Sequence, residues 1–436
     1  MEDLVIFLNS IKMARNFNWR RFLRFWNKSA GQPTPIDPPP TEEPGPSLDN
    51  PAAFQAEFLG FNPGWTWNVN SPNLAQTSAY AMGALRFPAG TLGNYYHYAT
   101  NGYGLVQSEM DVVGDSIPIT DHTGQNYIID FADYAVSEGI TQVIYMAGLF
   151  FQRGGSPREY QEHLDAIQYL ESRGLTVVGV QAHNETNFDK YSVLYPSDWA
   201  LFKTHFLEFV ADLATIGSYD VGVQIPNIQN RNKPRAQSFY DFVTTDTDIT
   251  SNIDFYNMHL YPTTEVLNTQ ETAFLDDLKV IQAIKPVRFT EFNVNGEQGS
   301  SYTYRGLQHA KDLWRIYLLL LDAGAEMLFV HNLYGQNVNA FYNHNQGTST
   351  MAELWKELTF LLGSQYEVVL YENLRALRAT NGGVLYTVFS NTSDEVIRIV
   401  LSDTATVKVL NETGFDIYTY NEFYNVQPGD LVIISE

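Results

Sequence analysis

The chain of 436 residues contains no cysteine. Disulfide bonds, thiol nucleophiles and cysteine-bound metal sites are therefore excluded. Charged residues make up only 17% of the sequence, but acidic residues outnumber basic ones by 49 to 26, which gives a formal net charge of −23. An acidic surface repels phosphate backbones, so we expect no nucleic-acid partner, whereas neutral sugars are compatible.

Motifs of several other enzyme classes are also missing. No Gly-rich phosphate loop follows the first candidate strand, and no GxSxG element supplies a serine nucleophile. The nine histidines form no HxH or HExxH pattern. We therefore expect no catalytic metal and no cofactor. The spacing of Asp246 and Asp248 leaves a structural calcium open, although the complete loop pattern is absent.

The first thirty residues differ from the rest of the chain. Residues 1–30 carry six basic and two acidic side chains, a net charge of 6 − 2 = +4, with aromatic residues between them. This pattern indicates either an amphipathic helix that docks on an assembly partner or a membrane surface, or a frayed tail. The apolar run at 4–8 is too short to span a membrane and makes a poor signal peptide. The Pro-rich segment 31–52 predicts a semi-rigid linker.

From residue 55 onward, short apolar runs alternate with longer amphipathic stretches. Candidate strands cover residues 56–61, 83–87, 141–147, 175–182, 219–225, 254–259, 286–291 and 326–332. Helical spacing of apolar residues marks the stretches 157–174, 196–216, 270–284, 302–323 and 349–362. Strands alternating with helices in this way predict an α/β fold, a closed (β/α)8 TIM barrel over residues 53–363. An open doubly wound sheet is the structural alternative.

The pattern changes near residue 365. Residues 364–436 form short β-rich segments separated by turn residues, which predicts a C-terminal antiparallel β-sandwich domain. Such a domain either binds sugar or buries one face of the barrel.

Two glutamates follow strand-like runs at corresponding places. Glu185 lies in HNETN after the fourth candidate strand, and Glu291 lies in FTEFN at the seventh. They are 291 − 185 = 106 residues apart, roughly three βα units of a barrel. Because the carboxyl ends of barrel strands meet at one mouth, we expect the two carboxyl groups to face each other.

A facing pair of carboxyl groups can cleave a glycosidic bond. One group protonates the leaving oxygen, and the other stabilises the oxocarbenium-like carbon. A carboxyl with the ordinary pKa of about 4.3 is ionised at pH 7, so the acid requires a raised pKa. We expect the neutral neighbours of Glu185 and the facing carboxylate to raise it, while donors such as Arg86 and Tyr261 keep Glu291 ionised.

Four segments resemble the retaining glycoside hydrolases of clan A, over about residues 55–363. The Asn184-Glu185 pair and the lone Glu291 match the acid/base and nucleophile positions of that clan. The stretch RFPAGTLGNYYHY (86–98) is similar to an Arg-aromatic-Pro-Gly-Gly segment of its arabinofuranosidase-like and heparanase-like branches, with Ala89 at the first glycine. HLYP (259–262) is similar to a His/Tyr element of the clan. The resemblance implies Glu185 as acid/base, Glu291 as nucleophile, and retention of anomeric configuration.

Other residues near the expected strand ends are candidates for substrate contacts. They are Arg86, His183, Asn184, His259, Tyr261, His331, Asn332, Trp65 and Tyr95. Asn184 would contact a sugar hydroxyl next to the reacting carbon. Many clan members place a stacking tryptophan at the eighth strand, where this chain has His331 and Asn332. Tyr334, Trp65 or Trp67 would then supply the stacking surface.

The sequence therefore predicts a retaining glycoside hydrolase that acts on a polysaccharide or oligosaccharide. The alternative is a non-catalytic carbohydrate-binding or structural barrel of a virion or cell surface, which a carboxyl separation above about 10 Å would favour. A barrel lyase or transglycosylase is a third option. We favour an extracellular, cell-surface or virion-associated location over the cytoplasm. The sugar, its linkage, endo or exo action and the oligomeric state stay open.

Overall fold

The computed structural model describes most of the chain from residue 48 onward. The described residues are 48–63, 77–88, 90–98, 111, 114, 127–148, 157–196, 198–295, 304–335, 340–343, 347–371, 374–401, 404–412 and 414–436. The chain divides into two compact units, Met1–Glu43 and Pro44–Glu436, and every described residue belongs to the second. The docking segment expected at 1–30 lies outside the described residues and stays a prediction, as does the linker up to residue 47.

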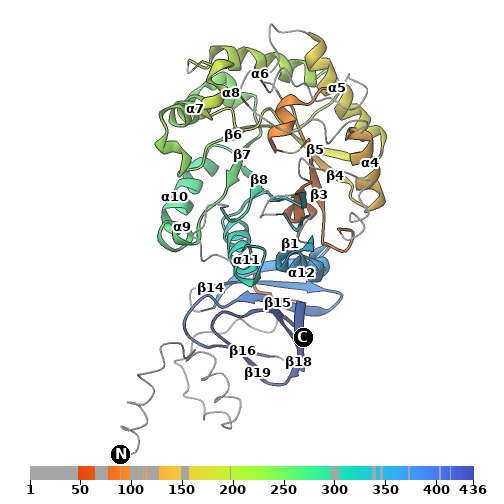
Figure 1. Cartoon of the computed structure of the whole chain (residues 1–436), viewed down its shortest axis with the longest axis vertical. Coiled ribbons are helices and arrows are strands. Elements are labelled where there is room, and N and C mark those ends of the chain that lie inside the picture. Colours follow the sequence, from red (N-terminus) through yellow and green to blue (C-terminus); the bar gives the residue numbers. More distant parts are fainter. Residues whose placement is uncertain are drawn as a thin grey trace, which may run out of the picture. The chain divides into compact units, whose positions relative to one another are not determined.

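Within the described residues, eight parallel strands close into a barrel (Figure 1). They are β2 (Gly60–Asn62), β3 (Ala84–Phe87), β4 (Gln142–Met146), β5 (Thr176–Gln181), β6 (Val221–Ile225), β7 (Phe255–Leu260), β8 (Val287–Phe292) and β9 (Met327–His331). The last strand returns to the first, with Phe61 opposite Val330. The predicted TIM barrel is confirmed, and the doubly wound alternative is wrong because no edge strand is left in this sheet.

Helices surround the barrel (Figure 1). They are α4 (Tyr127–Ser137), α5 (Pro157–Ser172), α6 (Ala200–Leu213), α7 (Pro234–Thr245), α8 (Thr247–Ser251), α9 (Thr264–Thr269), α10 (Glu271–Gln282), α11 (Leu307–Asp322) and α12 (Thr350–Glu357). Single 3-10 turns are η1 (Ala56–Leu59), η3 (Gly90–Tyr95), η6 (Asp189–Val193), η7 (Asn230–Asn232) and η8 (Leu358–Leu361). No helix in this described part of the chain is long and apolar enough to cross a membrane.

The barrel strands have nearly continuous apolar sequences because one face of each strand packs in the barrel core and the other packs against helices. Every residue of β6, β7 and β8 is buried, as expected for parallel strands between a core and helices. Ala84, Ile144 and Phe329 belong to one apolar cluster. Arg86 and His331 lie two residues further along the same strands, so they point to the same side one layer nearer the barrel mouth.

The predicted strand at 56–61 is only partly a strand. Ala56–Leu59 form the turn η1, and pairing begins at Gly60. The chain enters the barrel closely packed there, since a Cβ atom at Gly83 would lie 2.0 Å from the carbonyl oxygen of Ala56. A short apolar run does not distinguish a strand from a helical turn, which is why the prediction missed this boundary.

A seven-stranded antiparallel sheet follows the barrel, in the order β1-β13-β14-β15-β20-β17-β18. Its strands are β1 (Ala52–Ala53), β13 (Gln365–Tyr371), β14 (Leu374–Asn381), β15 (Val384–Ser390), β17 (Ala405–Asn411), β18 (Gly414–Tyr420) and β20 (Leu431–Ser435). A two-stranded sheet of β16 (Ile397–Val400) and β19 (Phe423–Val426) covers an apolar cluster that includes Phe389, Ile399 and Val432. The predicted β-sandwich is confirmed.

The opposite face of the large sheet packs on the barrel. Leu377, Val388 and Ile433 belong to the same buried cluster as the barrel core, and α11 contacts β13, β14 and β15. The sandwich therefore buries one side of the barrel, which is one of the two roles that the sequence left open.

Strand β1 comes from the other end of the chain. Ala52 pairs with Tyr366 on β13, and the backbone amides of Asp49 and Asn50 donate to Glu367 Oε2 at 2.8 and 3.1 Å. The last residues of the predicted linker are thus attached to the sandwich. A strand of two residues is too short to show an alternating apolar pattern, so the sequence could not predict it.

Short elements after β9 complete the described fold. β10 (Tyr334–Gly335), β11 (Tyr342–Asn343) and β12 (Gly347–Thr348) form a small sheet. After β6, Asp246 caps α8 by accepting from the amides of Asp248 and Ile249. Lys203 Nζ pairs with Asp246 and Asp248 at 2.8 and 2.6 Å. A lysine ammonium thus neutralises the two carboxylates for which calcium was left open.

Candidate active site

The two glutamates occupy the carboxyl ends of their strands. Glu185 lies in the turn that follows β5, and Glu291 is the next-to-last residue of β8. The pairing register shifts between Met258 and His259 on β7 and between Phe289 and Phe292 on β8. Such irregularities re-aim side chains next to functional sites. Here they lie beside His259 and Glu291.

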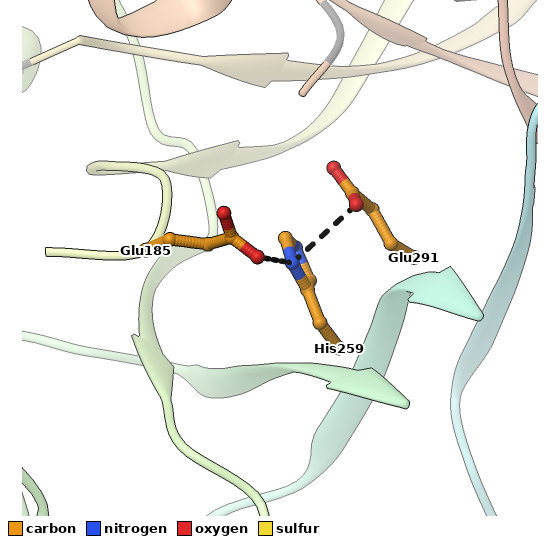
Figure 2. A group of neighbouring side chains, drawn as sticks. All are labelled: Glu185, His259 and Glu291. Carbon is orange, nitrogen blue, oxygen red and sulfur yellow. Dashed lines mark hydrogen bonds and ion pairs between the residues drawn. The ribbon is translucent and has the colours of Figure 1, made fainter. Parts of the chain in front are cut away.

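His259 lies between the two carboxylates (Figure 2). Its Nδ1 atom is 3.2 Å from Glu185 Oε1 and 3.5 Å from Glu291 Oε2. The three atoms all lie within 4.8 Å of one another. The Glu291 side chain is 7% exposed and that of Glu185 is 19% exposed. One carboxylate is therefore enclosed, and the other is more open to solvent.

Arg86 connects the parts of the site. Its guanidinium is completely buried and donates through Nη1 to Glu291 Oε1 at 2.5 Å and to Asn62 Oδ1 at 3.1 Å. Through Nη2 it donates to Asn184 Oδ1 at 2.8 Å. A fork of donors fits this arrangement, because guanidinium groups bind carboxylate and amide oxygens in one plane. Glu291 and the chain segment before Glu185 are thus held by a single side chain.

The surroundings of Glu291 favour its ionised form. Burial alone would raise the pKa of the Glu291 carboxyl, but the positive charges of His259, His331 and Arg86, together with the Tyr261 hydroxyl, lower it to about 2. The Tyr261 hydroxyl donates to Glu291 Oε2 at 2.8 Å. Burial raises the pKa of Tyr261 well above its ordinary value, so this hydroxyl keeps its proton. Glu291 is therefore a carboxylate throughout the physiological pH range.

Two further groups border Glu291. His331 Nδ1 is 3.9 Å from Glu291 Oε2, and burial lowers the pKa of this histidine. Gly90, at φ +57°, comes so close that a Cβ atom there would lie 3.7 Å from Glu291 Oε1. A Cβ atom at position 90 would be in ordinary van der Waals contact with the carboxylate, but the positive φ would strain a residue other than glycine.

The turn that carries Glu185 is fixed from three sides. Glu185 adopts φ +55°, a left-handed conformation that is uncommon for residues other than glycine. Its backbone amide donates to Gln224 Oε1 at 2.7 Å. Asn94 brackets the preceding residue, accepting from the Asn184 amide at 3.2 Å and donating to its carbonyl at 3.1 Å. A strained backbone at a functional site persists only when surrounding contacts hold it in this way.

Arg235 on α7 supplies the third side. It donates to the carbonyl oxygens of Thr186 and Phe188, both at 3.1 Å, and its guanidinium lies 4.3 Å from the ring centre of Trp199. The contribution of Asn94, Gln224 and Arg235 was not predicted. Polar residues that bind a backbone carry no local sequence signature, because their partners lie far away in the chain.

Of the predicted substrate residues, the structure brings Arg86, His259, Tyr261 and His331 to the glutamate pair. Others lie behind it. His183 is fully buried, accepts or donates a hydrogen bond with Thr186 Oγ1, and stands edge-on to the rings of Phe202 and Phe239. Burial lowers its pKa to about 3, so it is a neutral core residue. The prediction that His183 faces substrate is not supported by this placement.

Three more predicted contacts are covered by protein atoms. Tyr95 is 0% exposed and packs in the barrel core, so its ring offers no surface on which a sugar can stack. Asn184 and Asn332 are each 1% exposed, and Asn184 is engaged by Arg86. Trp65, Trp67 and the side chain of Tyr334 lie outside the described residues.

Comparison with known proteins adds a fold relationship. No protein-family model matches the sequence, and no curated protein matches it. The chain is similar in structure to a glycoside hydrolase family 30 subfamily 8 xylanase from Clostridium acetobutylicum, with 10% identity, a TM-score of 0.50, and coverage of 86% of this chain and 95% of that chain. It is also similar to an endo-β-1,6-glucanase, with 13% identity, a TM-score of 0.51, and coverage of 88% and 90%. At these identities the likeness shows a shared fold.

Proposed function

We propose that this chain is a retaining glycoside hydrolase in which Glu291 is the nucleophile and Glu185 is the general acid and base. The observation that carries the proposal is the carboxylate pair at the barrel mouth. Oxygen atoms of Glu185 and Glu291 lie within 4.8 Å of each other. Retaining enzymes hold their two carboxyl groups about 5–5.5 Å apart, whereas inverting enzymes hold them about 6.5–9.5 Å apart to admit a water molecule.

The different surroundings of the two carboxylates support the assignment of roles. Glu291 is enclosed and bound by Arg86 and Tyr261, which suits a group that must attack as an anion. Glu185 is more exposed and has its contact with His259. A group that gives a proton to the leaving oxygen and later takes one from water needs this access to solvent.

The proposed reaction has two steps. A Glu291 oxygen attacks the anomeric carbon while the bond to the leaving oxygen breaks and Glu185 donates its proton to that oxygen. A covalent glycosyl ester forms on Glu291. Water then attacks the same carbon, Glu185 accepts its proton, and the Glu291 carboxylate is released. Arg86 binds Glu291 Oε1 throughout, so the carboxylate keeps its orientation in both steps.

The same separation counts against the non-catalytic alternative, which a distance above about 10 Å would have favoured. The substrate class follows less directly. The similar structures are named for activity on xylan and on β-1,6-glucan, so β-linked polysaccharides of neutral sugars are the first class that we propose for this chain. Its negative net charge is compatible with neutral glycans.

The proposal predicts that Glu291→Gln and Glu185→Gln abolish hydrolysis without unfolding the chain. A panel that begins with xylan and β-1,6-glucan identifies the substrate, and reducing-sugar release measures the rate. Loss of the acid/base Glu185 should lower the rate by about 10²- to 10⁴-fold, the range for one acid–base group, and loss of the nucleophile Glu291 by at least as much. Glu326→Gln is the matched control, because Glu326 pairs with Arg288 away from this site. The control should keep its activity.

Leaving-group chemistry separates the two roles. An aryl glycoside with an acidic phenol as leaving group needs no proton, so Glu185→Gln should still release one equivalent of phenol in a rapid burst. Glu291→Gln should give no burst. Full activity on polysaccharide in either variant would falsify the assignment.

A further inference from the structure

The three atoms that converge at the barrel mouth form a ligand set for a metal ion. Glu185, His259 and Glu291 come from three different parts of the barrel, and each offers one ligand atom within 4.8 Å of the others (Figure 2). His259 Nδ1 faces Glu185 Oε1 and Glu291 Oε2. We propose that a divalent transition metal ion such as Zn²⁺ binds among these atoms and reversibly inhibits the chain. The inhibition rests on the proposed function, since the ion would occupy both carboxylates that hydrolysis uses. Binding of the ion does not rest on the proposed function.

The spacing suits small first-row ions. Zinc bonds to imidazole nitrogen and carboxylate oxygen at about 2.0–2.2 Å, and tetrahedral ligands around it are then about 3.3–3.5 Å apart. The two distances from His259 Nδ1, 3.2 and 3.5 Å, are already close to this spacing. Only the distance between the two carboxylate oxygens has to shorten. Glu185 is the most exposed of the three side chains, at 19%, so it has room to move.

The bonding capacity of each ligand atom is compatible with an ion. Arg86 binds the other oxygen of Glu291, Oε1. Glu291 Oε2 accepts one hydrogen bond from Tyr261, which leaves a second lone pair on that oxygen. His259 directs Nδ1 at two carboxylate oxygens, so a positive centre belongs among the three atoms. A proton on Nδ1 can make a good hydrogen bond to only one of the two carboxylates, whereas a divalent ion can bond to both.

The buried state of His259 provides a second, independent observation. This side chain is 5% exposed. The imidazole is therefore held by the surrounding protein at the exit of β7 and points Nδ1 into the cluster (Figure 2). A ligand that is fixed in place before the ion arrives loses little conformational freedom on binding.

The donor set also predicts which ions bind. One nitrogen and two oxygens suit Zn²⁺, Ni²⁺ or Cu²⁺, since imidazole is a ligand for these metals. Ca²⁺ takes six to eight oxygen ligands and Mg²⁺ requires an octahedral oxygen shell, which this cluster does not offer. We therefore expect binding of Zn²⁺ and no comparable binding of Mg²⁺ or Ca²⁺.

The test measures binding and inhibition separately on the full chain. After chelator treatment and dialysis, Zn²⁺ is titrated in competition with a chromophoric zinc indicator, which gives stoichiometry and Kd without any substrate. His259→Asn and Glu185→Gln should each raise the Kd for Zn²⁺ at least about tenfold. Removal of a group that only hydrogen-bonds a metal ligand already weakens metal affinity about 10- to 100-fold, and loss of the ligand itself should weaken it no less. Glu162→Gln is the matched control, since Glu162 pairs with His97 at 2.8 Å elsewhere in the barrel. Its Kd should not change.

Circular dichroism of each variant verifies that the fold is intact. With the substrate that the glycan panel identifies, Zn²⁺ should inhibit competitively at the concentration where it binds. Wild-type Kd values in both site variants, equal binding of Mg²⁺, or full activity with the ion bound would each overturn the proposal. Binding of Zn²⁺ by a chain that cleaves no glycan would uphold the metal site and contradict the proposed hydrolase.

Discussion

Arg86 is the residue on which the arrangement of the candidate site depends most. Its buried guanidinium donates to Glu291, Asn62 and Asn184, which belong to different strands or turns. Burial, the largest effect on the pKa of Glu291, raises it. The charges of His259 and His331, followed by the charge of Arg86, lower it. A neutral residue at position 86 would remove both the positive charge and the hydrogen bonds that orient Glu291 and Asn184.

We predict that Arg86→Gln raises the pKa of Glu291. The positive charge stabilises the ionised carboxylate, so its loss favours the protonated form, by about one pH unit or more. The acidic limb of the kcat/KM profile, which reports the free enzyme, should then move to higher pH. Arg86→Lys keeps the charge and should move the limb less. An unchanged acidic limb in the glutamine variant would show that Arg86 does not control Glu291.

At this scale the sequence predicted the residues of the pair and part of their surroundings. Glu185, Glu291, Arg86 and Tyr261 could be found because they end strands whose apolar pattern is clear. His183 also ends a strand but points into the core against Phe202 and Phe239. Sequence position shows that a residue is at the mouth, but the side to which it points depends on local backbone geometry.

At the scale of elements, the turn after β5 is the part that requires most support. Glu185 has a positive φ, and contacts from η3, β6 and α7 hold the turn through Asn94, Gln224 and Arg235. The strands could be predicted from periodicity, whereas these contacts could not. Each joins segments that are distant in the chain, and amide side chains look alike whether they bind solvent or a backbone.

We predict that Gln224→Met and Arg235→Met lower kcat with little change in KM. Each removes a hydrogen bond that fixes the acid/base turn, and a displacement of about 1 Å at a reacting group can cost about 10²-fold in rate. Gln237→Met is the control, because Gln237 is on the same helix as Arg235, is half-buried, and its side-chain amide donates to Asp241 on that helix. Steady-state kinetics of the three variants, with melting curves, measure the effect. Equal kcat values in all three would refute the positioning role.

At the scale of the whole described unit, barrel and sandwich share a hydrophobic core. Leu377 of β14 is completely buried in the cluster that contains the barrel residues Trp314 and Trp355. Arg375 adds ion pairs from β14 to Glu271 and Asp322. The change of pattern near residue 365 predicted a second domain, but not that β1 joins its sheet or that its large sheet continues the barrel core. The first feature depends on pairing across more than three hundred residues, and the second on the packing of α11 against β13, β14 and β15.

We predict that Leu377→Ala destabilises the barrel as well as the sandwich. Truncation of a buried leucine costs about 2–5 kcal/mol, and a shared core makes the two parts unfold together. Residues 364–436 contain no tryptophan, so tryptophan fluorescence reports the unfolding of the barrel. The urea midpoint seen by fluorescence should nevertheless fall. An unchanged fluorescence midpoint would mean that the two parts unfold independently.

The stereochemistry of hydrolysis tests the central claim most directly. Proton NMR of the reaction on the substrate identified by the panel, recorded before mutarotation, shows the configuration of the first anomeric hydroxyl released. Oxygen atoms of the two carboxylates lie within 4.8 Å of each other, which is closer than the about 6.5–9.5 Å by which inverting enzymes separate their carboxyl groups. The account predicts that the first product has the same anomeric configuration as the substrate. A first product of the opposite configuration would contradict it.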